Sequence, residues 1–311
     1  MKILPHNSGH IWLCEANESL FDCKVDEILK SVQHSGYILF RDFNPTQDEF
    51  EKFTNLFGIC ADTRHVHYPN TGEGLGFHAE DAYNPYRPDV IWFFCAFQGS
   101  DGGIPTNVVD GIKVFEKLPN TWKEFCRKEK LRFNRQWTAD VWQESTKQYC
   151  NPKTSTSSIS DILSVTPNIE FEFLSNDFLY IAYQTPIISK TIFNKECFAN
   201  TMLQAISDPA FYGMTLSNGD PIPAELIDIV EKLSFENEEA ISWLTGDIAL
   251  IDNLRMMHKR SAYKQIDRDL RARHGENFFG TILPDTPSQL HQWVKSLIQG
   301  DIALPSKVGY P

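Results

Sequence analysis

The sequence predicts a mainly β protein with flanking helices (α+β), built on a double-stranded β-helix, or jelly-roll, core. Many short segments have strand character, and they lack the regular alternation with helices that a parallel α/β sheet requires. The segment from Val90 to Phe97 is apolar throughout, as a central strand of a sandwich should be, and a turn at Asp101-Gly-Gly follows it. We find no glycine-rich loop of the dinucleotide- or phosphate-binding type.

The first elements can be placed from periodicity and capping residues. Apolar side chains recur at helical spacing from Val25 to Gln33, which predicts an amphipathic helix, and Tyr37 to Phe40 predicts a short strand. Thr46 and Glu49 form a capping-box pattern at the start of a second helix, which ends near Gly58.

The middle of the chain predicts a mixture of helices and strands. We expect a helix from about Ile112 to Glu129 that is interrupted at Pro119, two further helices, and three extended segments. The further helices are expected at 195–206 and 223–233, and the extended segments at 169–174, 179–183 and 277–283. The polar stretch from Tyr149 to Ser160 is predicted to be a mobile lid.

These elements predict a single domain over residues 1–311. It would comprise an N-terminal extension at about 1–60 and a jelly-roll core at about 61–285. The core would contain an insertion at about 112–240, and a C-terminal helix would follow at about 286–311.

Composition excludes several classes of function. The net charge of −12 and the absence of a strongly basic segment argue against a nucleic-acid partner. No apolar run is long enough to span a membrane, and the N-terminus lacks the apolar core of a signal peptide. Seven scattered cysteines without a Cys-x-x-Cys motif indicate a reducing compartment. We therefore expect a soluble, cytoplasmic protein of undetermined oligomeric state.

His78 and Glu80 form the most informative motif. Side chains alternate along an extended strand, so a His-x-Glu pair points to the same side. A second histidine, His258, ends the run from Trp243 that contains the Gly-Asp and Asp-Asn turns. Two imidazoles and one carboxylate are the facial triad that holds non-haem Fe(II) and leaves coordination positions open. The alternative is an accidental pair, because an isolated His-x-Glu is common. His65 and His67 form a second histidine pair, and without a third ligand nearby we expect them to line the substrate entrance.

Three stretches of the sequence resemble the clavaminate-synthase-like branch of the TauD/TfdA family of Fe(II)/2-oxoglutarate dioxygenases. They are residues 36–43, residues 76–110 with the Gly-Gly-x-Pro-Thr turn that ends at Thr106, and residues 243–283. The resemblance implies that Fe(II) binds His78, Glu80 and His258. It further implies that Thr106 and an arginine after His258 hold 2-oxoglutarate, and we assign that arginine as Arg273. Arg268 and Arg271 are the alternatives, because the second basic residue that relatives often carry is Asn277 here.

The resemblance also implies the chemistry. With O2 and 2-oxoglutarate as cosubstrates, such enzymes oxidise an unactivated C–H bond by hydroxylation, desaturation or ring closure, and they release succinate and CO2. Glutamate in the triad points toward a small amino acid or amino-acid-derived metabolite, as in natural product biosynthesis. The candidate substrate contacts are Asp81, Tyr83, Arg87, Asn253, Arg260, Arg271 and Asn277.

Two other functions stay open at this point. One is a catabolic dioxygenase that acts on a sulfonate or another small carboxylate. The other is a β-barrel binding module without catalytic activity, in which the triad is accidental.

Overall fold

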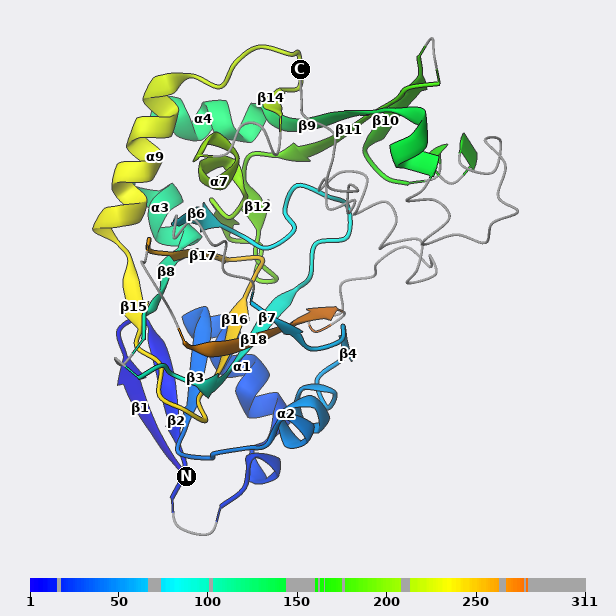
Figure 1. Ribbon diagram of the computed structural model, residues 1–311. Coiled ribbons are helices and arrows are strands. Elements are labelled where there is room, and N and C mark those ends of the chain that lie inside the picture. The colour runs from blue at the N-terminus through cyan, green and yellow to red at the C-terminus, as the bar shows by residue number, and fades with distance from the viewer. Residues whose placement is uncertain are drawn as a thin grey trace.

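Two sheets face each other at the centre of the molecule, in a computed structural model that confirms the predicted mainly β, jelly-roll fold (Figure 1). The structure describes residues 1–15, 18–66, 74–100, 103–143, 160–161, 163–164, 166–174, 177–207, 213–262, 267–276 and 278. The main sheet has the strand order β1(Lys2–His6), β2(Gly9–Leu13), β3(Tyr37–Arg41), β16(Ile248–Asp252), β7(Val90–Phe97), β18(Asp269–Glu276) and β4(Ile59–Cys60), and β5(Arg64–His65) also pairs with β18. The opposite sheet has the order β15(Glu239–Ile241), β8(Thr106–Asp110), β17(Met256–Arg260) and β6(Leu75–His78).

Alternation along the strands separates two apolar cores. On β7, Ile91 and Phe93 point between the two sheets, where they pack with Val108 of the opposite sheet. Trp92 and Phe94 point the other way and pack beneath the N-terminal helices. Each face of the main sheet is thus buried against a different layer, and the side chains between the two sheets form the inner core.

The N-terminal elements agree with the sequence prediction, except that the second helix ends at Thr54 and not near Gly58. Helix α1(Val25–Ser35) packs against the outer face of the main sheet, and its C-cap Gly36 has φ 88°, a left-handed conformation that favours glycine. Helix α2(Gln47–Thr54) begins with the predicted capping box, in which the Thr46 hydroxyl accepts a hydrogen bond from the backbone N–H of Glu49. The short 3-10 helix η1(Leu20–Asp22) precedes α1.

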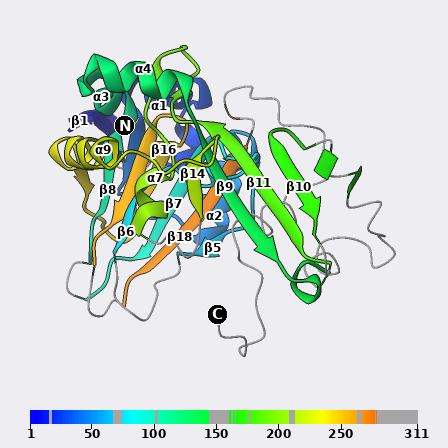
Figure 2. The same ribbon diagram turned by 90° about the horizontal axis from the view of Figure 1, so that it is seen from above.

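The predicted insertion forms a layer of its own. Its helices are α3(Gly111–Lys117), α4(Asn120–Lys128), α7(Met202–Ser207) and α9(Ala224–Glu236). Its strands are β9(Lys130–Trp137), β10(Ile169–Phe173), β11(Leu179–Pro186) and β14(Met214–Leu216), which make one sheet, and the pair β12(Ser189–Lys190) and β13(Glu196–Cys197). In Figure 2 the strands β9, β11 and β10 extend to one side of the jelly roll. Within the described residues, no helix is both long enough and apolar enough to cross a membrane.

The helix predicted from Lys195 to Ile206 is wrong in its first half. Residues 196–197 form strand β13, and α7 begins only at Met202. The Asn200 side chain explains this start, because its Oδ1 accepts a hydrogen bond from the Met202 N–H while its amide donates to the Ile187 carbonyl. By contrast, Pro119 divides the predicted helix at 112–129 into α3 and α4 as expected.

Other predictions lie wholly or mostly outside the described residues. Of the predicted strand at 277–283 only Phe278 is described, and it packs on Phe57 and Trp92. Of the predicted lid at 149–160 only Ser160 is described, and the predicted C-terminal helix at 286–311 lies entirely outside. The predicted N-terminal extension contributes β1 to β4 to the main sheet and is therefore part of the core architecture.

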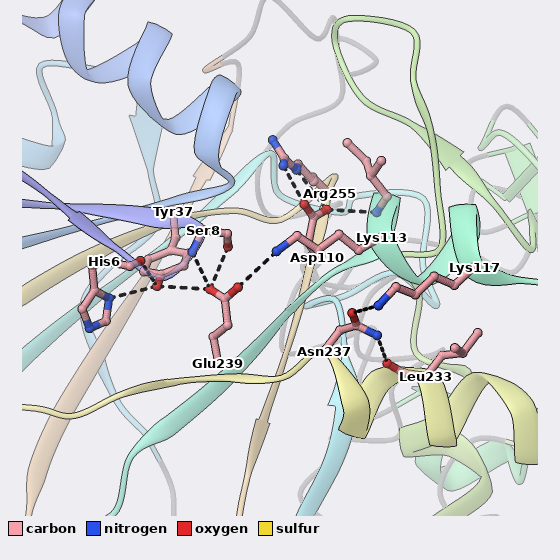
Figure 3. A network of polar contacts seen from close by, with 11 residues as sticks. His6, Ser8, Tyr37, Asp110, Lys113, Lys117, Leu233, Asn237, Glu239 and Arg255 are labelled. Carbon is pink, nitrogen blue, oxygen red and sulfur yellow. Dashed lines mark hydrogen bonds and ion pairs between the residues drawn. The ribbon is translucent and has the colours of Figure 1, made fainter.

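A polar network ties the N-terminal hairpin to the opposite sheet (Figure 3). The Glu239 carboxylate accepts hydrogen bonds from Ser8 Oγ at 2.7 Å, from Lys113 Nζ at 3.2 Å and from the Tyr37 hydroxyl at 3.4 Å. Nearby, Arg255 donates to both oxygens of the Asp110 carboxylate, at 3.0 and 2.6 Å. This pair fixes the turn before β17 against the end of β8, and both strands carry residues of the candidate site.

Candidate metal centre and its surroundings

The structure brings the three predicted metal ligands together. His78 on β6 lies opposite His258 on β17 in the antiparallel ladder, and their ring centroids are 4.2 Å apart. Glu80 follows β6, and its Oε2 lies 3.6 Å from His78 Nε2 and 3.7 Å from His258 Nε2. The three ligand atoms lie within 4.8 Å of one another.

Both imidazoles can offer a lone pair to a metal ion. His78 Nδ1 lies 2.9 Å from the Gly76 carbonyl, to which it can only donate, so in the neutral ring Nε2 carries the lone pair. Burial, together with the neighbouring His78 ring, lowers the pKa of His258 to about 3, so the His258 ring is neutral at physiological pH. Two lone pairs and a carboxylate that converge in a buried place fit a divalent cation of the Fe(II) type.

Asn253 holds the backbone of Glu80 in place. Its Oδ1 accepts from the Glu80 N–H at 2.8 Å, and its amide donates to the carbonyls of Glu80 at 2.9 Å and Pro88 at 2.8 Å. Arg87 donates to the carbonyls of Ala199, at 2.8 Å, and Asn253. Both residues were predicted to contact the substrate, and in the structure they organise the backbone around the carboxylate ligand.

The second oxygen of Glu80 meets a cation. Arg64 Nη2 donates to Glu80 Oε1 at 2.8 Å, and His274 Nε2 lies 3.4 Å from the same oxygen. Burial alone would raise the pKa of the Glu80 carboxyl, but the neighbouring His274 and His78 rings and the Arg64 charge hold it well below its usual range. Glu80 is therefore ionised, as a metal ligand must be.

Asp81, Tyr83 and His274 form a polar cluster behind Glu80. His274 Nδ1 lies 3.3 Å from Asp81 Oδ2, and the Tyr83 hydroxyl donates to Asp81 Oδ1 at 2.9 Å. Glu80, Asp81 and His274 could also be grouped as metal ligands. However, the two carboxylates contact different nitrogens of the His274 ring, and Arg64 already meets the Glu80 oxygen, so this group does not resemble a second cation site. Asp81 and Tyr83, predicted as substrate contacts, are buried here.

Thr106 and Arg268 lie near each other at the start of β8. Thr106 is buried, and its hydroxyl oxygen accepts a hydrogen bond from Trp243 Nε1 at 3.0 Å, which leaves the hydroxyl proton available for a carboxylate. Arg268 is also buried, and its guanidinium donates to the carbonyl of Ile104, two residues before Thr106. Arg260 pairs directly with Thr106 in the β17–β8 ladder, and this places the two side chains on one face.

The structure does not bring Arg273 to this place. Arg273 lies within β18, where it pairs with Trp92, whose side chain belongs to the core beneath the N-terminal helices. Its Nε donates to the Ala61 carbonyl at 2.8 Å and its Nη1 to the Glu51 carbonyl at 3.0 Å, on the side of α2. Arg271 shares this outer face and donates to Asp269 at 2.6 Å. The inner face of β18 carries Leu270, Ala272 and, by alternation, His274.

The remaining predicted residues are placed as follows. His65 is exposed and lies 3.0 Å from the Asp269 carboxylate, whereas His67 and Asn277 lie outside the described residues. The sequence prediction missed Arg64 and His274. A signal for His274 was present in the sequence. Alternation along the strand places His274 on the face opposite to Arg271 and Arg273.

The chain belongs to the TauD/TfdA dioxygenase family. The family model described as "Taurine catabolism dioxygenase TauD, TfdA family" matches residues 14–274, which include all three triad residues. This match confirms the family predicted from the sequence, and the protein is an enzyme of the oxidoreductase class. Iron, 2-oxoglutarate and O2, the predicted cofactors, agree with this family.

Individual relatives are distant. The dapdiamide synthesis protein DdaC of Enterobacter agglomerans is 22% identical over 306 residues, which cover 84% of this chain and 90% of DdaC. The crystal structure of PvcB from Pseudomonas aeruginosa superposes with a TM-score of 0.59 at 11% identity, covering 87% of this chain and 86% of PvcB. AAD-2, solved with Mn(II) and N-oxalylglycine, gives a TM-score of 0.58 at 12% identity and covers 89% and 98% of the two chains. At these identities the two structures show the shared fold.

Proposed function

We propose that this enzyme is an Fe(II)/2-oxoglutarate-dependent oxygenase of the clavaminate-synthase-like branch, with His78, Glu80 and His258 as the metal ligands. The observation that carries the proposal is the convergence of two imidazoles and one carboxylate in the interior of a TauD-type jelly roll. Bound iron, together with 2-oxoglutarate and O2, supplies the oxidation of an unactivated C–H bond, and succinate and CO2 are released.

We further propose that Arg268, with Thr106, binds 2-oxoglutarate in place of Arg273. Arg268 is buried beside the segment that leads to Thr106, whereas Arg273 bonds to α2 on the opposite face of the main sheet. A planar guanidinium can make two parallel hydrogen bonds to a carboxylate, and the Thr106 hydroxyl retains a proton to donate. These residues bind and orient the cosubstrate, and the sheets around them exclude water.

The proposed substrate is a small amino acid or an amino-acid-derived metabolite. The family relative DdaC is named for dapdiamide synthesis, and PvcB is described as an Fe, alpha-ketoglutarate dependent oxygenase from an isonitrile synthetic pathway. Both names point to biosynthesis of small molecules, which supports a biosynthetic role here. Among the predicted substrate contacts, Arg260 is the one that shares a strand face with His258, and we propose that it binds a substrate carboxylate.

The test has two stages. The anaerobic protein with Fe(II) and 2-oxoglutarate should develop the weak visible charge-transfer band of a chelated cosubstrate, and a binding module without the site would develop none. Succinate release is then screened over amino acids, acylated or peptide-linked amino acids, sulfonates and aryloxy acids. Strong stimulation by a sulfonate or an aryloxy acid, with none by the amino-acid group, would favour the catabolic alternative.

A further inference from the structure

The two oxygens of the Glu80 carboxylate face different partners. Oε2 faces the Nε2 atoms of His78 and His258, at 3.6 and 3.7 Å, where the metal would be held. Oε1 accepts a hydrogen bond from Arg64 Nη2 at 2.8 Å and lies 3.4 Å from His274 Nε2. A charge-assisted bond from a guanidinium is among the stronger hydrogen bonds of proteins, so it competes with metal ligation for that oxygen.

Arg64 is itself held from behind. Its Nη2 lies 2.5 Å from His274 Nε2, and since a guanidinium only donates, that nitrogen is the acceptor. The His274 proton then resides on Nδ1, which faces Asp81 Oδ2 at 3.3 Å, and the Tyr83 hydroxyl donates to the other oxygen of Asp81. A continuous chain of polar contacts thus runs from Tyr83 through Asp81 and His274 to Arg64. It fixes the Arg64 guanidinium from β18, a strand that carries none of the proposed metal ligands.

The location of Arg64 suits a role beyond a surface ion pair. It lies on β5, which pairs with β18 at the edge of the main sheet, opposite Ala272. Its side chain is 47% exposed, yet its Nη2 reaches a carboxylate that is only 19% exposed. Exposed ion pairs contribute little because water screens them, whereas the inner end of this one is largely removed from water.

We propose that Arg64 is a positioning residue that restricts Glu80 to binding iron through a single oxygen, Oε2. The inference rests on the proposed function. A facial triad leaves three coordination positions open, and 2-oxoglutarate takes two of them. If both Glu80 oxygens bound the metal, no position would remain for O2. Arg64 therefore keeps the last coordination position open for O2. His274, Asp81 and Tyr83 hold the Arg64 guanidinium in place.

The experiment compares Arg64→Met with the wild-type protein and with Arg64→Lys, which keeps the charge but loses the planar fork. The readouts are Co(II) affinity of the apoprotein, the anaerobic charge-transfer band with Fe(II) and 2-oxoglutarate, and binding of nitric oxide, an O2 surrogate, followed by electron paramagnetic resonance. The matched control is Arg127→Gln, which removes an arginine of α4 that pairs with Glu124 on the same helix and with Glu196 of β13.

We expect Arg64→Met to bind Co(II) and form the band, but to bind nitric oxide at least about tenfold more weakly. Arg64→Lys should recover part of the loss, and Arg127→Gln should match wild type. Wild-type nitric oxide affinity in Arg64→Met would overturn the inference, and so would equal losses in Arg64→Met and Arg127→Gln. If wild-type protein itself forms no band, the proposed function fails instead. If Arg64→Met does not fold, unchanged nitric oxide affinity in a folded Arg64→Lys protein would overturn the inference.

Discussion

The two faces of the main sheet both bury polar side chains, but these side chains have different partners. On the inner face, His274 turns toward Glu80 and the neighbouring triad. On the outer face, Arg273 is equally buried, yet its guanidinium serves the carbonyls of Glu51 and Ala61 in the N-terminal scaffold. Arg273 and His274 are adjacent in the sequence, so burial and residue type do not distinguish a site residue from a scaffold residue here. The face of the strand does.

The largest effect should come from the inner face, at the triad itself. We expect His258→Ala to abolish iron binding and succinate production, because it removes one of the three proposed ligands. Equilibrium dialysis with Fe(II) under anaerobic conditions measures this directly. His10→Ala, which removes a histidine bonded to Ser31 outside the interior, is the control and should bind iron normally. Full activity in His258→Ala would exclude the proposed metal site.

The second prediction sets one arginine of each region against the other. Arg268→Ala should weaken 2-oxoglutarate binding on the order of 30-fold or more. It removes a buried charge-assisted hydrogen-bond donor, whose loss costs about 2 kcal/mol or more of binding free energy. Arg273→Ala should leave that affinity within about twofold but lower the free energy of unfolding by about 3 kcal/mol, since it removes a buried guanidinium that donates to the carbonyls of Ala61 and Glu51. Titration of the charge-transfer band and urea unfolding measure the two quantities.

The outcome would reverse if the sequence-based assignment were right. A large loss of 2-oxoglutarate affinity in Arg273→Ala, with none in Arg268→Ala, would return the role to Arg273. Comparable losses in both variants would indicate that the affinity depends on the stability of β18 and not on one guanidinium.

The comparison also shows how far the sequence could predict the site. The triad was predictable because its ligand types and the close His-x-Glu spacing can be seen in the sequence, although Glu80 lies just beyond the end of β6 and not on the same strand as His78. The arginine was not, because the parity of β18 depends on its pairing with β7, where Arg273 lies opposite the outward-facing Trp92. Arg64 was missed for a related reason, since it reaches Glu80 from a two-residue strand at the sheet edge.

The predictions of helices and strands also succeeded where neighbouring residues decide the structure and failed where a distant contact does. Local signals such as the Thr46 capping box and the Pro119 break were predicted correctly, because the residues that cause them are neighbours in sequence. The helix predicted from Lys195 failed because a distant contact decides where it begins: the Asn200 amide bonds to the Ile187 carbonyl.

The smallest expected effect lies on the outer face and concerns pH. Asp252 ends β16, where Ile248 and Leu250 point to the outer core, so by alternation Asp252 shares their face. Burial raises the pKa of this carboxyl to about 7, even though the Leu254 N–H donates to it. Because the folded-state pKa is above the unfolded value, the neutral carboxyl contributes stability at low pH, and this contribution is lost as pH rises toward and through 7.

Asp252→Asn keeps the hydrogen-bond acceptor and removes the titrating carboxyl. We expect its free energy of unfolding, relative to wild type, to increase by on the order of 1 kcal/mol between pH 5 and pH 8, as measured by urea unfolding of the apoprotein, with 2-oxoglutarate affinity unchanged at both pH values. A difference from wild type that is constant over this range would show that Asp252 does not titrate there, and a change in 2-oxoglutarate affinity would break the separation between the two faces.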